Sequence, residues 1–244
     1  MLKKTLTGCA LAGVLTLSLA GPAMADIADS TLDTTLKVTP AKAGTAKSPK
    51  PLKLTLRMEG GTKSGTGMPS TTTRLKVQLP SGIAWNGKAW PKKQRCDVNR
   101  VNRERSLKSC PKGAIIGKGH VTALAGNGAL VEEIDVTAVV TSAGNLGLYL
   151  DATVPVPIQT MIEGKVSKKG LIDVAIPANI QQPALGVRSS IKTLTFTLEG
   201  KTNVKGRSMG VVASTGCKKS WKMKVTNVMT DGSLTDVASA SCRR

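Results

Sequence analysis

PLKLTLRM, residues 51–58, alternates apolar and polar side chains without a break. In an extended chain, its leucines and its methionine fall on one face, while the lysine, threonine and arginine between them fall on the other. This two-residue period is typical of a β-strand with one buried and one solvated face. The stretch therefore predicts a half-buried strand.

The same alternation recurs along most of the chain, which predicts a protein built from many short strands. Turn signals such as Asn127-Gly128 and Asp231-Gly232 separate the strands. The clearest further examples are TLDTTLKV (31–38), TRLKVQL (73–79), EIDVTAVV (133–140), NLGLYLDA (145–152), SIKTLTFTL (190–198) and SWKMKVTNV (220–228).

About a dozen such strands, with no helical pattern of about ten residues after residue 25, predict an all-β fold. We expect an antiparallel two-sheet β-sandwich, immunoglobulin-like or jelly-roll-like, as a single domain over residues 26–244. The alternative is two small β domains that divide near residues 155–157, because Pro155 and Pro157 cannot donate to a strand ladder. A brief helix is expected inside residues 97–107.

Residues 1–25 have the pattern of a secretory signal peptide. Lys3-Lys4 precedes an apolar run from Leu6 to Ala20, and Ala23-Met24-Ala25 is a small-x-small cleavage site. We expect cleavage after Ala25 and a secreted protein, extracellular or associated with the cell wall. The mature chain would carry a formal charge of +18, since Lys3 and Lys4 are lost from a total of +20.

Leu6-Thr7-Gly8-Cys9 offers a competing interpretation, because it resembles a lipobox with an acylated cysteine. A lipobox follows the apolar core of its signal, whereas most of this core lies after Cys9. A signal peptide is therefore favoured over a lipid anchor. No later run of about 18 apolar residues predicts a transmembrane segment.

Four cysteines remain after cleavage, and in an exported protein an even number predicts disulfides. They allow three pairings. We favour the two local ones, Cys96 with Cys110 and Cys217 with Cys242, because each closes a short excursion near a predicted strand end. Zinc is disfavoured, since neither pair has zinc-ligand spacing and a single histidine cannot complete a Cys2His2 set. No cofactor or metal site is expected.

Basic residues are densest between Lys88 and Lys118. This segment of 31 residues holds ten basic side chains against Asp97 and Glu104, a net charge of +8. Such a patch attracts phosphate-rich polymers and anionic membrane surfaces, but taken alone it is more often a solvated loop of a basic protein. The predicted polyanion-binding residues are Lys88, Lys92, Lys93, Arg95, Arg100, Arg103, Arg105, Lys108, Lys112 and Lys118.

Catalytic patterns are weak, so no catalytic residue is predicted. Ser208 lies in a G-x-S-x-G match, but a strand-like stretch follows it and the only histidine, His120, precedes it. Glu132 and Glu133 are adjacent in a predicted strand and should point to opposite faces. The five aromatic residues are too few for the stacking platforms of single-strand nucleic-acid binders, so specific nucleic-acid binding is not expected.

Two cysteine-containing motifs carry a resemblance to a known family. Leu79-Pro80-Ser81-Gly82 is followed by Cys96 and then by Cys110-Pro111 with IIGKG at 115–119, and a second cysteine pair closes the chain. This pattern resembles a family of uncharacterised secreted actinobacterial proteins. The resemblance implies an exported, β-rich protein, and it supplies no activity or site residue.

These observations favour a non-catalytic exported protein associated with the cell envelope, which binds anionic cell-wall polymers or an anionic membrane surface through its basic face. One alternative is a freely secreted protein–protein interaction module, whose positive charge serves solubility. The other is an enzyme of unfamiliar type.

Overall fold

The computed structural model describes residues 27–65, 67–204 and 206–243, so the signal peptide predicted over residues 1–25 lies outside the described residues. The described chain is all-β, with two disulfides and only short helices. The strands are β1 (Ser30–Thr39), β2 (Lys50–Pro51), β3 (Lys53–Thr62), β4 (Thr72–Gln78), β5 (Ile83–Trp85), β6 (Ile115–Ala125), β7 (Leu130–Val140), β8 (Leu146–Ala152), β9 (Ile158–Val166), β10 (Leu171–Ala175), β11 (Ser189–Leu198), β12 (Lys201–Val204), β13 (Arg207–Gly210), β14 (Val212–Ser214), β15 (Ser220–Met229) and β16 (Gly232–Ser241). The α-helices are α1 (Val98–Glu104) and α2 (Ala178–Gln181).

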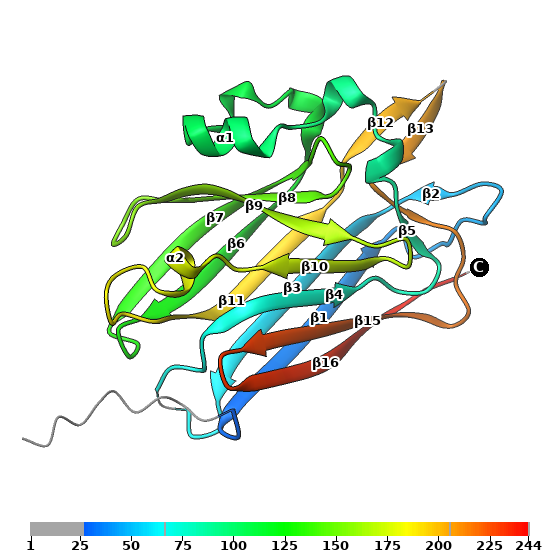
Figure 1. Ribbon diagram of the computed structural model, residues 1–244. Helices are drawn as coiled ribbons and strands as arrows, with labels where there is room; N and C mark the ends of the chain where they lie inside the picture. The colour runs from blue at the N-terminus through cyan, green and yellow to red at the C-terminus, as the bar shows by residue number, and fades with distance from the viewer. Residues whose placement is uncertain (1–26, 66, 205, 244) are drawn as a thin grey trace, which may run out of the picture.

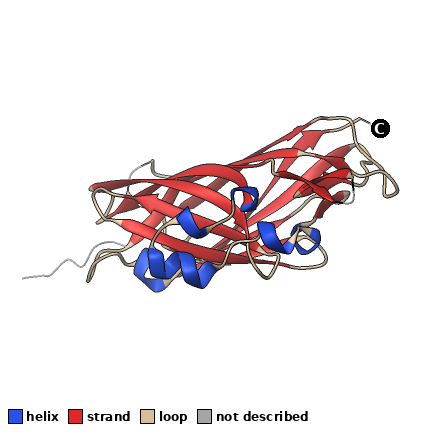
Figure 2. Cartoon of the chain, turned by 90° about the horizontal axis from the view of Figure 1, so that it is seen from above, coloured by secondary structure: helices blue, strands red, loops and turns tan. Residues whose placement is uncertain are grey.

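Eleven of these strands form one antiparallel sheet in the order β1-β3-β11-β6-β7-β8-β9-β10-β4-β15-β16. The sheet curls into an elongated body with the short helices gathered along one side (Figures 1 and 2). Its two edge strands meet where the amide and hydroxyl groups of Thr34 in β1 donate to Asp236 Oδ2 in β16, at 2.8 and 2.6 Å. The sheet is therefore a nearly closed barrel.

This arrangement corrects the expectation of a two-sheet sandwich. Alternating side chains show that one face of each strand is buried, but they do not show whether that face packs against a second sheet or against the far side of the same sheet. In this protein the buried faces pack against the far side of the same sheet. β8 and β9, on either side of Pro155–Pro157, pair with one another in this sheet.

The predicted inward faces form the core. In β3, Leu54, Leu56 and Met58 are buried while Lys53 and Arg57 are exposed, as PLKLTLRM predicts. Trp221, Met223 and Val225 of β15 fill the same interior. The alternation thus places aliphatic and large side chains inside, and the removal of their apolar surface from water stabilises the fold.

Two small sheets lie at one end of the barrel (Figure 1). β2, β14 and β5 form a three-stranded sheet, and β12 pairs with β13. Cys217 and Cys242 are joined there with their Cα atoms 6.4 Å apart, as predicted. Gly82 of the Leu79–Gly82 turn has a φ of +83°, and a Cβ at this position would lie 2.2 Å from the Gly216 carbonyl oxygen. The turn therefore requires glycine.

Candidate anion-binding surface

Residues 87–114, called here the 87–114 segment, fold into α1 and four 3-10 turns: η1 (Gly87–Ala89), η2 (Lys92–Gln94), η3 (Leu107–Ser109) and η4 (Lys112–Ala114). Asp97 caps α1, because its Oδ1 accepts the amide of Arg100 at 3.1 Å. Arg105 ends the helix in the left-handed conformation, with a φ of 48°. The brief helix predicted inside residues 97–107 is confirmed.

The 87–114 segment is fastened to the outer face of β7, β8 and β9. Val101 of α1 is fully buried in a second apolar cluster with Tyr149 and Met161, on the side of the sheet away from the main core. The Asn102 side chain pairs with the Met161 backbone in both directions, donating from Nδ2 at 3.0 Å and accepting at Oδ1 at 2.6 Å. The Tyr149 hydroxyl donates to the Arg105 carbonyl at 2.8 Å.

A disulfide joins Cys96 to Cys110 across this segment, with 4.9 Å between their Cα atoms, so the favoured local pairing is confirmed. Cys96 also donates its amide to Val140 and accepts from the Ser142 amide, each at 2.8 Å. Cys96 is thus held by the sheet, and the disulfide to Cys110 holds the later part of the 87–114 segment. The segment is therefore docked against the sheet.

The basic side chains of this region fall into two groups. Arg95 is half-buried, and its guanidinium donates to the carbonyls of Lys88, Trp90 and Ser142, so it supports the loop itself. Among the described residues, Arg100 alone of the ten has an ion pair, with Glu104 at 2.8 Å. The exposed members are Lys88, Lys92, Lys93, Arg100, Arg103, Arg105, Lys108, Lys112 and Lys118.

Not all of these residues lie together. η2, with Lys92 and Lys93, lies against η4, with Lys112, and the Trp90 indole fixes this contact by donating to the Gly113 carbonyl at 2.9 Å. Lys118 instead projects from β6, outside the 87–114 segment. Lys92, Lys93 and Lys112 therefore lie on two turns that pack together.

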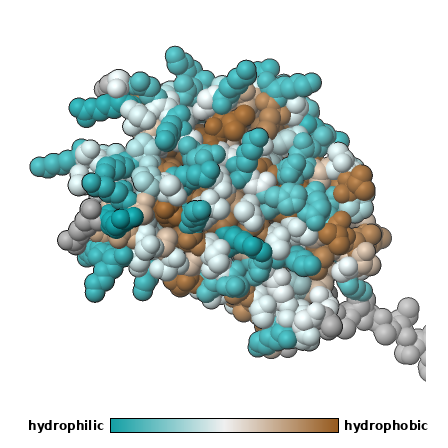
Figure 3. Space-filling view, turned by 180° about the vertical axis from the view of Figure 1, so that it is seen from behind, coloured by the Kyte–Doolittle hydropathy of each residue, from teal (hydrophilic) through white to brown (hydrophobic). Residues whose placement is uncertain are grey.

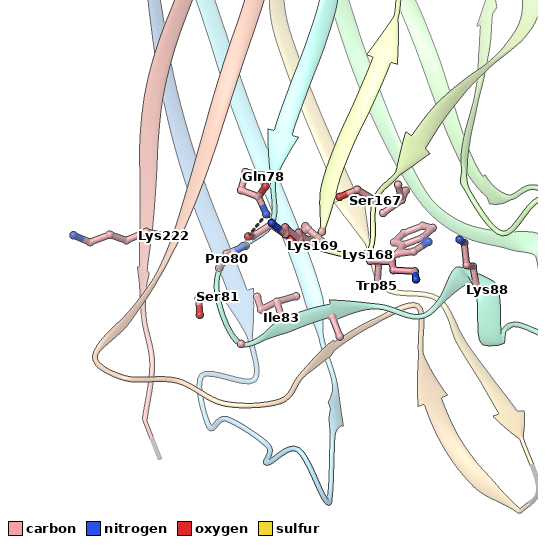
Figure 4. A pocket seen from close by; sticks show the side chains of 15 residues that line it. Gln78, Pro80, Ser81, Ile83, Trp85, Lys88, Ser167, Lys168, Lys169 and Lys222 are labelled. Carbon is pink, nitrogen blue, oxygen red and sulfur yellow. Dashed lines mark hydrogen bonds between the residues drawn. The ribbon is translucent and has the colours of Figure 1, made fainter.

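A surface cavity of about 640 Å³ lies beside Lys88 and adds lysines that charge counting along the sequence missed. Its lining includes Lys168 and Lys169 from the β9–β10 turn, and Trp85. Figure 4 shows Lys168 and Lys169 near Trp85, with Lys88 beyond it, whereas Lys222 points away. Gln78 positions the turn by donating to the Lys169 carbonyl at 2.8 Å. A Lys-Lys-Gly turn is visible in the sequence, but its proximity to Lys88 is not.

His120 lies on the exposed outer face of the barrel and contacts two carboxylates. Its Nδ1 lies 3.0 Å from Asp135 Oδ1 and its Nε2 lies 2.6 Å from Glu133 Oε2. Hydrogen bonds from the ring to Asp135, and then to Glu133, raise the pKa of His120. Ser208 is exposed in the β12–β13 hairpin, where strand rather than helix follows its turn.

The ring of His120 should titrate above its ordinary value of about 6.5. We expect an NMR titration of this single histidine to give a midpoint above 6.5 that falls towards 6.5 in the Glu133→Gln, Asp135→Asn double variant. The pKa of His120 is raised in the folded protein. The stabilisation of the fold by the charged His120 ring and its two carboxylates is therefore complete below about pH 6.5, and it is lost as the pH rises through the folded-state pKa. Glu199→Gln, at a distant exposed carboxylate, should leave the midpoint unchanged. Equal midpoints in the wild type and the double variant would contradict this assignment.

Within the described residues, no group of three or more His, Cys, Asp or Glu side chains is placed to hold a metal ion. None of the helices described is long and apolar enough to cross a membrane. No family model matches the chain, and no curated protein matches it. The similarity to secreted actinobacterial proteins therefore stays a prediction.

Proposed function

We propose that this is an exported, non-catalytic protein that binds anionic polymers of the cell envelope through the 87–114 segment and the adjacent lysine-lined cavity. One observation carries the proposal. The segment is docked on the sheet at its base, while its lysine and arginine side chains other than Arg95 face the solvent, nearly all without an acidic partner among the described residues. The charge is therefore available to a ligand.

Binding of this kind has a recognisable physical signature. A phosphate-rich polymer holds condensed counterions, and each lysine that neutralises a phosphate releases some of them. The affinity then falls steeply with salt concentration, because the released ions regain less entropy in concentrated salt. A docked loop also loses less conformational entropy on binding than a free one.

The predicted export supports an envelope location. The signal pattern of residues 1–25 directs the chain out of the cytoplasm, and two disulfides fit an oxidising, extracellular environment. Cell walls and membrane surfaces there present anionic groups to a protein whose formal charge is +20 before cleavage.

Charge reversal at the lysines of the packed turns η2 and η4 should test the proposal. We expect Lys92→Glu, Lys93→Glu, Lys112→Glu to bind inorganic polyphosphate at least tenfold more weakly than the wild type at about 50 mM salt. The slope of log affinity against log salt should also fall by about 2, given about 0.7 per lost phosphate contact on a single-stranded polymer. Isothermal titration calorimetry across a salt series measures both quantities.

The matched control is Lys37→Glu, Lys47→Glu, Lys63→Glu, which changes the net charge equally at exposed positions outside the 87–114 segment. We expect this variant to lose much less affinity. Equal losses in the two variants would show that net charge alone attracts the polymer and would overturn the assigned surface. Wild-type binding that does not depend on salt would overturn the electrostatic mechanism.

A further inference from the structure

The interior of the barrel is not completely filled. A cavity of about 130 Å³ lies inside the sheet, lined almost entirely by aliphatic side chains from its strands and from α2. Ile191 and Leu194 of β11 line it and are only partly buried, although they face inwards. For comparison, an apolar cavity of about 150 Å³ in another protein stays dry and admits benzene. This interior can therefore accept a narrow hydrocarbon group.

A second cavity of about 90 Å³ lies next to the first. Ala123, Ile134 and Ile180 line both, so the two cavities are neighbours. The outer one lies between the β6–β7 strands, α2 and the loop that carries Pro155 and Val156. The second cavity thus lies beside α2, at the end of the barrel opposite β5 and the β9–β10 turn, whose residues line the lysine-lined cavity (Figure 1).

A buried carboxyl group lines the outer cavity. Glu132 is only 6% exposed, and its Oε2 accepts the Val156 amide at 3.1 Å. Its Oε1 is buried and has no hydrogen-bond partner among the residues that the structure describes. Burial raises the pKa of Glu132, which favours the neutral acid. A buried polar atom without a partner costs stability, so an atom of this kind beside a cavity marks a position for a ligand's polar group.

Exposed apolar residues lie close to the second cavity. Leu130 lines it, and Val131, Val154 and Leu185 are each next in sequence to a residue that lines it. All four are exposed, and Leu185 is 100% exposed. Figure 3 shows apolar patches at the surface on the edge of the molecule nearer this end, whereas long hydrophilic side chains project from the opposite edge. Exposed apolar surface beside a cavity favours the approach of a hydrocarbon chain.

We propose that the barrel binds an uncharged single-chain amphiphile, whose hydrocarbon tail fills the interior cavity and whose hydroxyl head hydrogen-bonds with Glu132. A single chain fits the small volumes, and a hydroxyl head can donate to Glu132 Oε1 without bringing a second charge beside a buried carboxyl group. The site is separate from the 87–114 segment, so it does not depend on the proposed polymer binding.

The test uses 1-decanol as the probe and calorimetric or native mass-spectrometric titration as the readout. We expect the wild type to bind 1-decanol, and Ala123→Phe to abolish binding, because residue 123 lines both cavities. Glu132→Leu should weaken decanol binding at least tenfold, while binding of decane is retained. Glu132→Gln keeps an acceptor for Val156 and a polar group for the head, so it should bind decanol within about threefold of the wild type.

Three results would overturn the proposal. They are no saturable decanol binding by the wild type, unchanged binding by a folded Ala123→Phe variant, and equal decanol affinity in Glu132→Leu and the wild type. Circular dichroism checks that each variant is folded. If Ala123→Phe fails to fold, the Glu132 pair decides, because Glu132→Leu gives up one hydrogen bond, from the Val156 amide, and also removes a buried oxygen that has no partner among the described residues.

Discussion

Replacing Trp221 with alanine should lower the free energy of unfolding by about 3 to 5 kcal/mol, the largest effect expected from a single substitution here. Trp221 lies in β15, is 0% exposed and belongs to the main core. Its indole also donates to the Gly216 carbonyl at 3.1 Å, which fastens the loop before β15. Alanine would leave a cavity and would remove the shorter of the two hydrogen bonds that the Gly216 carbonyl accepts, the other coming from Ser214 Oγ at 3.4 Å. Urea denaturation followed by circular dichroism measures the loss.

Lys222→Ala is the matched control, because residue 222 is the next along β15 and its side chain is exposed. Its effect should stay within about 0.5 kcal/mol. A loss below about 1 kcal/mol for Trp221→Ala would contradict the packing of the barrel interior, since a collapsed or alternative core would no longer depend on that indole.

Removing the Cys96–Cys110 disulfide should lower the free energy of unfolding by about 3 kcal/mol. The reason is that the unfolded chain regains the conformational entropy that the bond removes over a separation of 14 residues. We expect the Cys96→Ala, Cys110→Ala variant to lose amide protection mainly in α1 and the turns around it. The apolar contacts of Val101 and the Asn102–Met161 hydrogen bonds would then hold the segment alone. Hydrogen exchange read by mass spectrometry locates the change.

Cys217→Ala, Cys242→Ala provides the comparison. This variant should lose a similar free energy, about 3.5 kcal/mol from its longer separation of 25 residues, but the exchange of α1 should stay as in the wild type. Exchange in α1 that is insensitive to loss of the Cys96–Cys110 bond would show that packing against β9 alone fixes the 87–114 segment. Such a result would remove the disulfide from the account of its rigidity.

Local pattern predicted much of this fold. The alternation of PLKLTLRM assigned the buried and exposed faces of β3, and both disulfide pairings followed from short separations near strand ends. The sequence also placed Glu132 and Glu133 on opposite faces. The structure confirms this, because Glu132 faces the interior and Glu133 contacts His120 outside.

The candidate sites were only partly predictable. Counting charges found the 87–114 segment, since its lysines and arginines are close in sequence. It did not separate Arg95, whose donors are used by nearby carbonyls, from the exposed lysines. Nor did it find Lys168 and Lys169, because 80 residues of chain separate Lys168 from Lys88, and only the fold brings them to one cavity.

The sequence by itself determined the strands, their buried faces, the disulfide pairing and the density of positive charge, because each depends on neighbours within a few tens of residues. Only the tertiary structure decided that one sheet curls until Thr34 of β1 meets Asp236 of β16. The same closure creates the apolar cavity and buries the carboxyl of Glu132 beside it. Period-2 alternation fixes which side of a strand is inside, whereas strand order and closure depend on contacts between distant segments that local pattern does not encode.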